Sequence, residues 1–298
     1  MRRILSMAVV AGLLVSTAAQ AQDANVFRPS GPWALDYGDD YCRLGRVFTD
    51  GSNEVEVGIE RIRPGEQVRI WLVGDAVRTF RGATETGYTF LPSQSERTVQ
   101  PIRSSRAGLQ VMSLPEVTLK PFAPPAPGAR FTPPPPYDPA AEQAFAKGIT
   151  AIGLGKGLTR PLRFETGALD APIAALQACT DDLVKSWGVD PDKNKSLSVP
   201  AIPQGQPWLA ANTIGFADFA KMAGNANQVR VMINAEGKPT SCHIAWATLG
   251  DEVNGGICKS VMEKASFIPA KDSGGQAVAS YWMGSPMFLM PPMGGGRR

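Results

Sequence analysis

Residues 54–62 read Glu-Val-Glu-Val-Gly-Ile-Glu-Arg-Ile, and residues 67–73 read Gln-Val-Arg-Ile-Trp-Leu-Val. In both runs apolar side chains alternate with polar ones. This is the pattern of a strand with one buried face and one face in water. The residues between them, Arg-Pro-Gly-Glu at 63–66, favour a turn. The two runs therefore predict a β-hairpin, and we expect an antiparallel sheet to extend from it.

Further strands are expected on both sides of this hairpin. Residues 42–48 are strand-like, and the Asp-Gly-Ser-Asn turn at 50–53 connects them to it. Shorter strand-like runs follow at 86–91, 109–114 and 116–120. Short runs of this kind, separated by glycine and proline, predict a β-rich first half with many turns.

A proline-dense segment at residues 121–136 interrupts this pattern. Proline has no backbone N–H and favours extended conformations. The segment is therefore predicted to be a surface loop of the first domain, and a PxxP ligand is the alternative. After it, Asp138 and Pro139 have the types of an N-cap and a first helical residue, which predicts a short helix to about residue 146. Residues 158–164 are expected to form a strand.

Residues 168–187 predict an amphipathic helix, because apolar side chains recur in them at intervals of three or four residues. The shared face consists of Leu169, Ile173, Leu176, Cys179, Leu183 and Trp187. If this face packs on the sheet, Cys179 can meet Cys42 in the first strand. Residues 27–188 are therefore predicted to form one β-rich domain with a closing helix.

The sequence contains four cysteines: Cys42, Cys179, Cys242 and Cys258. An even number suggests two disulfides in an oxidising compartment, and three pairings are possible. Cys242 and Cys258 lie in one compact segment, so we pair them with each other and Cys42 with Cys179. Buried free thiols are the alternative. A zinc site is a poorer interpretation, because the chain has no CxxC motif and only one histidine.

Residues 189–212 have little pattern and are predicted to be a linker. A second domain is expected at 213–292, followed by a flexible tail at 293–298. Its expected elements are a helix at 216–223, strands at 228–234 and 241–246, a helix at 252–265 and a long last strand at 277–289. The whole chain is thus predicted to be α+β, with an α-β-β-α-β order in the second domain.

Several short motifs in this second part occur together. They are Val-Arg-Val-Met-Ile-Asn-Ala-Glu-Gly at 229–237, Cys-His-Ile at 242–244, a helix containing Cys258, Phe-Ile-Pro-Ala at 267–270, and Gly-Gln-Ala-Val at 275–278. At these spacings, residues 213–292 resemble the TonB C-terminal domain family. Family members with cysteines carry one on the second strand and one on the second helix, and this resemblance also implies a Cys242–Cys258 bridge. Residues 27–188 match no family with such motifs.

The resemblance implies a protein-binding role. The family's last strand region pairs with an extended segment of an outer-membrane receptor, so that backbone groups at a sheet edge supply the affinity. The corresponding side chains here, expected to contact a protein or peptide, are Tyr281, Trp282, Met283 and Phe288. Pro286 lacks an N–H donor, so it is expected at an edge or a bulge.

The N-terminus has the features of a cleavable secretion signal. Arg2 and Arg3 precede an uncharged apolar run, and Ala19-Gln20-Ala21 is a small-x-small cleavage site. Residues 1–21 are therefore predicted to be removed after Ala21, which would place the mature chain in the periplasm. A retained anchor is the alternative, and it would favour a TonB-type energy transducer for outer-membrane transport. A membrane contact is otherwise expected only through a partner.

No catalytic or metal-binding constellation is found. His243, the only histidine, is interpreted as a surface residue. Asp36, Asp39 and Asp40 are interpreted as a solvated turn, because no EF-hand spacing follows them. The glycine-rich residues 153–157 are interpreted as a flexible connector, because they lack phosphate-loop spacing. Removal of Arg2 and Arg3 with the signal lowers the formal net charge from +3 to about +1, and the sequence has no basic run, so nucleic acid is not expected as a partner. We therefore expect a binding or scaffolding protein that is not an enzyme and has no cofactor. A hydrolase with a site between the domains is the rival hypothesis.

Overall fold

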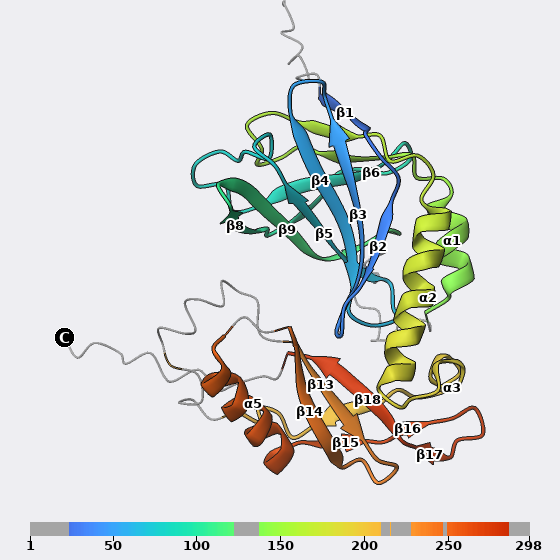
Figure 1. Ribbon diagram of the computed structural model, residues 1–298. Helices are drawn as coiled ribbons and strands as arrows, with labels where there is room; N and C mark the ends of the chain where they lie inside the picture. The colour runs from blue at the N-terminus through green and yellow to red at the C-terminus, as the bar shows by residue number, and fades with distance from the viewer. Residues whose placement is uncertain (1–23, 122–136, 210–214, 216–227, 247–248, 286–298) are drawn as a thin grey trace, which may run out of the picture.

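The computed structural model describes residues 24–121, 137–209, 215, 228–246 and 249–285. Within them the chain is mixed α and β, with one large curled sheet and few helices (Figure 1). Its buried apolar side chains form two separate cores. The first core is built from residues in the range 27–183, and the second from residues in the range 201–270. The described helices include none that is both long and apolar enough to cross a bilayer.

The large sheet has eleven strands in the order β7-β6-β10-β11-β1-β3-β4-β5-β9-β8, with β2 paired to β3. The strands are β1 (Asn25–Pro29), β2 (Ala34–Tyr37), β3 (Cys42–Thr49), β4 (Glu54–Arg61), β5 (Gln67–Val73), β6 (Thr86–Leu91), β7 (Arg97–Val99), β8 (Ile102–Arg106), β9 (Leu109–Thr118), β10 (Ala151–Leu154) and β11 (Leu162–Phe164). All neighbours are antiparallel except β1 and β11, which are parallel. The predicted hairpin is confirmed as β4 and β5, which pair Gly58 with Trp71.

The sheet curls until its two ends approach each other. Arg97 on β7 donates hydrogen bonds to the carbonyl oxygens of Thr118 and Lys120, at the end of β9, over 2.8 and 3.2 Å. The alternation seen in the sequence decides which side chains point inward. On β4, for example, Val55, Val57 and Ile59 are fully buried in the first core. The other face of the same strands points away from this core.

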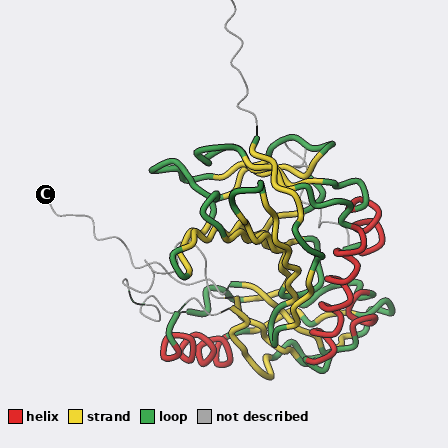
Figure 2. The backbone as a smooth tube through the Cα atoms, turned by 45° about the horizontal axis from the view of Figure 1, so that its top comes forward, coloured by secondary structure: helices red, strands yellow, loops and turns green. Residues whose placement is uncertain are grey.

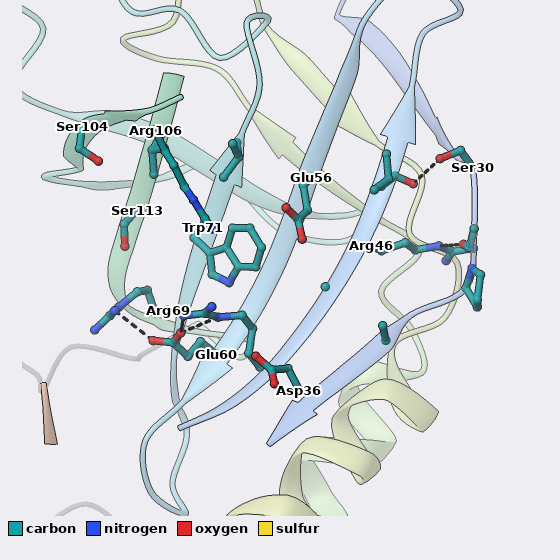
Figure 3. Close-up of a pocket in the computed structure, with 18 of the residues that line it drawn as sticks. Ser30, Asp36, Arg46, Glu56, Glu60, Arg69, Trp71, Ser104, Arg106 and Ser113 are labelled. Atoms are coloured by element: carbon teal, nitrogen blue, oxygen red, sulfur yellow. Dashed lines mark hydrogen bonds and ion pairs between the residues drawn. The ribbon is translucent and has the colours of Figure 1, made fainter. Parts of the chain in front are cut away.

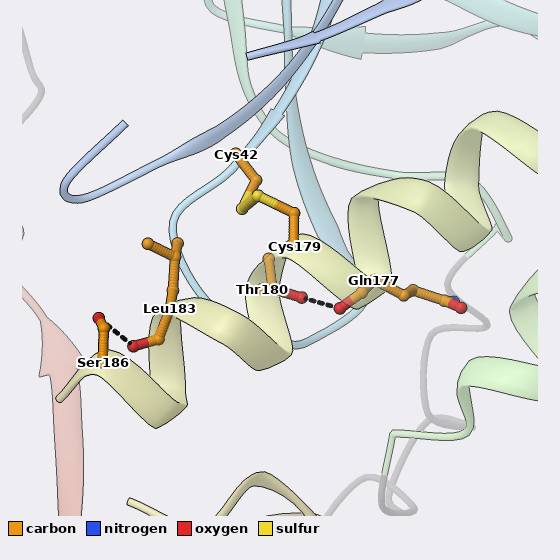
Figure 4. Close-up of a disulfide and its surroundings, with 6 residues drawn as sticks. All are labelled: Cys42, Gln177, Cys179, Thr180, Leu183 and Ser186. Atoms are coloured by element: carbon orange, nitrogen blue, oxygen red, sulfur yellow. Dashed lines mark hydrogen bonds between the residues drawn. A yellow bond between two sulfur atoms is a disulfide. The ribbon is translucent and has the colours of Figure 1, made fainter. Parts of the chain in front are cut away.

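Two helices cover one side of this sheet (Figures 1 and 2). The first, α1 (Pro139–Ala146), begins as predicted, with Asp138 accepting a hydrogen bond from the Ala141 N–H at 3.0 Å. The second, α2 (Asp170–Ser186), is joined to β3 by the predicted Cys42–Cys179 disulfide (Figure 4). The bridge therefore connects residues far apart in the sequence where helix and sheet meet.

A buried cluster of hydrogen bonds and one ion pair connects the two helices to β4. Arg61, whose side chain is fully buried, forms an ion pair with Glu142 and donates to the Tyr137 hydroxyl at 3.1 Å. The Tyr137 hydroxyl donates to Glu142 at 2.7 Å, and Gln177 of α2 donates to the same carboxylate at 2.9 Å. Burial raises the pKa of Tyr137 above its usual range, so this hydroxyl stays protonated. Because each charged group has partners, the cluster can remain in the interior.

The second core is built on a three-stranded sheet, in the order β14-β13-β18. Its strands are β13 (Gln228–Ile233), β14 (Pro239–Trp246) and β18 (Ser280–Gly284), and α5 (Asp251–Lys264) packs beside β14. The predicted disulfide between Cys242 and Cys258 joins β14 to α5. Two small pairs complete this half: β12 (Ile202–Gln204) with β15 (Ser266–Ile268), and β16 (Ala270–Lys271) with β17 (Ala277–Val278).

Several sequence-based expectations need correction. The long last strand at 277–289 is wrong: β17 pairs with β16, whereas β18 pairs with β13 in a different sheet. The expected linker at 189–212 contains α3 (Pro191–Lys195) and β12, and its Trp208 is buried in the second core. The expected helix at 216–223 and most of the proline-dense loop at 121–136 lie outside the described residues.

Three expectations within the large sheet are also revised. Residues 153–157 are not a flexible connector, because residues 153 and 154 belong to β10 inside the sheet. The two short strands expected at 109–114 and 116–120 form one strand, β9, and Glu116 has a positive φ of 54° where the register with β5 shifts. The strand expected at 158–164 is limited to β11.

The two halves touch through a small polar and aromatic interface. Asp40, in the turn between β2 and β3, accepts hydrogen bonds from Arg230 at 2.8 Å and from His243 at 2.7 Å. The Arg230 guanidinium also lies over the Trp187 ring, 4.4 Å from its centroid, at the end of α2. We call Asp40, Arg230, His243 and Trp187 the interdomain cluster.

Candidate functional site

The side chains predicted to bind a partner are engaged within the chain. Tyr281 packs edge-on against Trp187 with ring centroids 5.1 Å apart, and burial raises its pKa. Trp282 packs in the second core, 5.5 Å from the Trp208 centroid. Met283 is 4% exposed. Phe288 lies outside the described residues, as does Pro286. The three described side chains therefore offer little surface to another protein.

The backbone of this strand, β18 (Ser280–Gly284), is paired with another described strand on one side only. β18 pairs with β13 on one side, and no strand in the described ranges pairs with its other side. Beside its end lies a cavity of about 260 Å³, lined by Met283 and Gly284 from the second half and by Arg63 and Gln67 from the β4–β5 hairpin. A main-chain edge is thus left at the boundary between the halves.

A larger hollow lies on the outer face of the large sheet, the face turned away from the first core (Figure 3). Its volume is about 680 Å³, within the range usual for small-molecule sites. Strands β2, β3, β4, β5, β8 and β9 supply most of its lining, which includes Arg43, Glu56, Glu60, Arg69, Trp71 and Arg106. We call this hollow the trough. The sequence predicted this face only as the wet side of the hairpin.

A tryptophan lies flat in the trough because one glycine, Gly58, makes room for it. Gly45, Gly58 and Trp71 are direct neighbours across β3, β4 and β5. A Cβ atom on Gly58 would lie 1.9 Å from Cε2 of Trp71, so only a glycine allows this close approach. The indole therefore lies against the backbone of β4, and the ring itself lines the trough.

A compact ion cluster forms the next row of the same face. Arg43, Glu60 and Arg69 are direct neighbours across β3, β4 and β5, two residues along each strand from the glycine–tryptophan row. Arg43 donates to Glu60 at 2.8 Å, and Arg69 approaches the other oxygen of Glu60 at 3.0 Å. Two guanidinium groups thus share one carboxylate. Burial lowers the pKa of Arg69 to about 9, and Glu60 opposes this shift.

The opposite row carries a carboxylate with no ion-pair partner in the described part of the chain. Glu56 is exposed and lies between Val47 and Val73 across the strands. Arg106 of β8 is likewise exposed and unpaired among these residues, and in Figure 3 it extends toward Trp71. Trp71 and Ser113 are direct neighbours across β5 and β9, and Nε1 of Trp71 and Oγ of Ser113 are buried without a hydrogen-bond partner there. Among the described residues, the trough thus presents one exposed carboxylate and one exposed guanidinium without ion-pair partners.

The other residues weighed in the sequence have structural roles. His243 and Asp40 belong to the interdomain cluster, and Asp36 accepts from the Tyr41 hydroxyl at 3.1 Å on the rim of the trough. All four cysteines are in disulfides, which fits an oxidising compartment outside the cytoplasm. Within the described ranges, no group of three or more His, Cys, Asp or Glu side chains is placed to hold a metal.

No family model matches the chain, and neither a curated protein nor a solved structure shows significant similarity to it. The resemblance of residues 213–292 to the TonB C-terminal domain therefore stays a prediction. The trough was missed because an alternating strand predicts a polar face without saying whether that face is flat or hollow. A signal for it was present: Gly58 interrupts a run of strand-forming residues directly opposite a tryptophan.

Proposed function

We propose that the chain is an exported, non-catalytic binding protein and that the trough is its ligand site. The observation that carries this proposal is the fixed platform of Trp71 on Gly58, with ion-paired arginines on one side and the unpaired Glu56 on the other. Side chains held in this way are positioned before a ligand arrives, which lowers the entropy cost of binding.

The composition of the trough supports binding over hydrolysis. Nucleophilic hydrolysis by a serine needs a base within hydrogen-bond reach of its hydroxyl. Ser104 and Ser113 line the trough, but Ser113 Oγ has no hydrogen-bond partner among the described residues. The acid in the deepest position, Glu60, is bound by two arginines, so it is poorly suited to act as a base.

The experiment separates binding from turnover. The mature chain and its Trp71→Ala variant are applied to arrays of saccharides and peptides, and both are incubated with chromogenic esters and glycosides. We expect at least one bound ligand class whose affinity falls tenfold or more in the variant, without turnover. Turnover that requires trough residues would refute the proposal in favour of the hydrolase hypothesis.

A second candidate function is protein recognition by strand pairing, as the TonB-C-like motifs imply. The observation that favours it is the outer edge of β18, which no described strand covers. An added strand would use backbone groups there, because Tyr281 and Trp282 are already packed inside the chain. Synthetic extended peptides should then slow amide exchange across residues 280–284. Unchanged exchange with every peptide would count against this role.

A further inference from the structure

We propose that the trough binds a short peptide whose two ends are free, with its amino group at Glu56 and its carboxylate at Arg106. This inference rests on the proposed function and names the ligand class of the same site. Glu56 and Arg106 both line the trough and are exposed, and among the described residues neither has an ion-pair or hydrogen-bond partner. They carry opposite charges and lie on either side of Trp71 in Figure 3, so they can hold the two ends of one ligand.

The ion cluster of the trough needs no charge from a ligand. With its neighbour on β2 it forms one row across β2, β3, β4 and β5, which consists of Asp36, Arg43, Glu60 and Arg69. The formal charges alternate in sign along this row and cancel. The Arg43 guanidinium also lies over Trp71, with its carbon atom 5.2 Å from the ring centroid. A charged ligand is therefore better placed further along the strands, on the other side of Trp71.

A mostly apolar row lies there and connects Glu56 to β8. Its members are direct neighbours across β3, β4, β5, β9 and β8, and all of them line the trough: Val47, Glu56, Val73, Val111 and Ser104. Three inter-strand spacings separate β4 from β8, so the row measures ~14 Å from Glu56 to Ser104. An extended chain advances ~3.3–3.6 Å per residue, so a peptide of three or four residues matches this length.

The β4 end of this row suits an ammonium group. Glu56 lies between Val47 and Val73, so neither of its cross-strand neighbours offers it a counter-charge. An ionised carboxylate only accepts hydrogen bonds, whereas an ammonium group has three N–H donors and no acceptor. The amino end of a peptide therefore supplies both the charge and the donors that Glu56 lacks within the described chain.

The β8 end of the row suits a carboxylate. Ser104 and Arg106 are two residues apart on β8, so their side chains share one face of the strand. The guanidinium of Arg106 can donate two parallel N–H bonds to a carboxylate, and the Ser104 hydroxyl adds a further donor. Between the two ends, Val73 and Val111 provide an apolar floor for a side chain of the peptide. The row thus complements a short peptide in both charge and polarity.

The test blocks the two ends of one peptide in turn. The probe is the tripeptide Ala-Leu-Ala with free ends, and its three derivatives carry an N-acetyl group, a C-terminal amide or both. Their affinities for the mature chain are measured by titration calorimetry at physiological ionic strength, where remote charges are screened. We expect each single block to weaken binding at least fivefold and the double block to weaken it further.

The outcomes separate this inference from the proposed function. Equal affinity for the free and the doubly blocked peptide, or a loss from only one of the two blocks, would overturn the two-ended assignment. Absence of peptide binding while another array ligand binds and depends on Trp71 would overturn it as well, and would leave the binding function standing. No binding of any peptide, together with arrays unaffected by Trp71→Ala, would overturn both.

Variants assign each end of the peptide to one side chain. Glu56→Gln should weaken the free peptide at least fivefold but the N-acetylated peptide less than twofold, because the latter has no ammonium group to lose. Arg106→Gln should do the same for the free and the C-amidated peptides. Glu54→Gln and Arg103→Gln change exposed charges on the same two strands outside the trough, and both should stay within twofold of the wild type. A Glu56→Gln variant that weakens the free and N-acetylated peptides equally would contradict the proposed orientation.

Discussion

Replacing one glycine under the indole tests whether the trough depends on a close approach between Trp71 and β4. In Gly58→Ala, the new Cβ would lie 1.9 Å from Cε2 and 2.1 Å from Nε1 of Trp71. Carbon atoms in contact are ~3.5–4.0 Å apart, so the ring must move by about 1.5–2 Å. The obstacle is a side chain, so the indole can tip outward while the sheet stays in place. The trough would then lose its flat platform.

The neighbouring glycine provides a matched control. In Gly45→Ala, the closest atoms to the new Cβ would be Glu56 Oε1 at 3.4 Å and Trp71 Cζ2 at 3.9 Å, which are ordinary contacts. Gly45 and Gly58 are direct partners across β3 and β4, and neither has a positive φ. Overpacking typically costs ~1–3 kcal/mol, whereas a tolerated Gly→Ala change stabilises by ~0.4–1 kcal/mol. The two substitutions should therefore shift stability in opposite directions.

Urea unfolding followed by far-UV circular dichroism measures this difference, and tryptophan emission reports the position of the indole. We expect Gly58→Ala to unfold at lower urea with emission shifted to longer wavelength. Gly45→Ala should match or exceed the wild type in stability and keep its emission. Equal losses in both variants, or an unshifted emission in Gly58→Ala, would refute the close-approach explanation.

Three further predictions concern charged groups. Asp40→Asn weakens the bonds to Arg230 and His243, so we expect ~1–2 kcal/mol less coupling between the halves, measured as faster amide exchange in β13. Glu142→Gln leaves the fully buried Arg61 without its counter-charge, so unfolding experiments should show a loss of ~3–5 kcal/mol. Hydrogen bonds from Ser52, Asn25 and Asn53 hold the pKa of Asp50 below its usual range. Its contribution to stability is therefore present above pH ~4 and lost as the pH falls, and Asp50→Asn should flatten the pH dependence of unfolding there.

Each of these three changes has a control. Asp39→Asn alters an exposed neighbour of Asp40 and should leave exchange in β13 unchanged. Glu165→Gln removes an exposed ion pair with Arg28 and should cost at most ~1 kcal/mol. Glu54→Gln should keep the acid sensitivity that Asp50→Asn removes. A control that behaves like its partner variant would show that the effect does not come from the contact named.

The sequence was informative where structure is local. The alternation in residues 54–73 predicted β4 and β5, the apolar spacing before Trp187 predicted α2, and Asp138 predicted the start of α1. In these cases a short segment decides its own conformation, so pattern and capping were sufficient. The Cys242–Cys258 pairing was likewise local, across 16 positions, and the Cys42–Cys179 pairing was the one that it left.

Expectations failed where distant segments decide the outcome. The last strand was drawn too long because residues 277–284 look uniformly extended, yet two different partners divide them between two sheets. The sequence also does not show that Tyr281 packs against Trp187 and Trp282 against Trp208; the contact of Tyr281 and Trp282 with a partner stays a prediction. The trough was missed for a related reason: it forms only when β2 and β8 flank the outer face of the curled sheet.

The parallel pairing of β1 with β11 limits the order in which the first core can assemble. Asn25, near the start of the described chain, is the direct partner of Leu162, and β1 separates β11 from β3 in the sheet. A chain that emerges N-terminus first exposes β1 long before its partner β11 exists. Pairing of β1 with β11 must therefore wait until about residue 164 is free, and until then β1 has an unpaired strand edge that is open to misassembly.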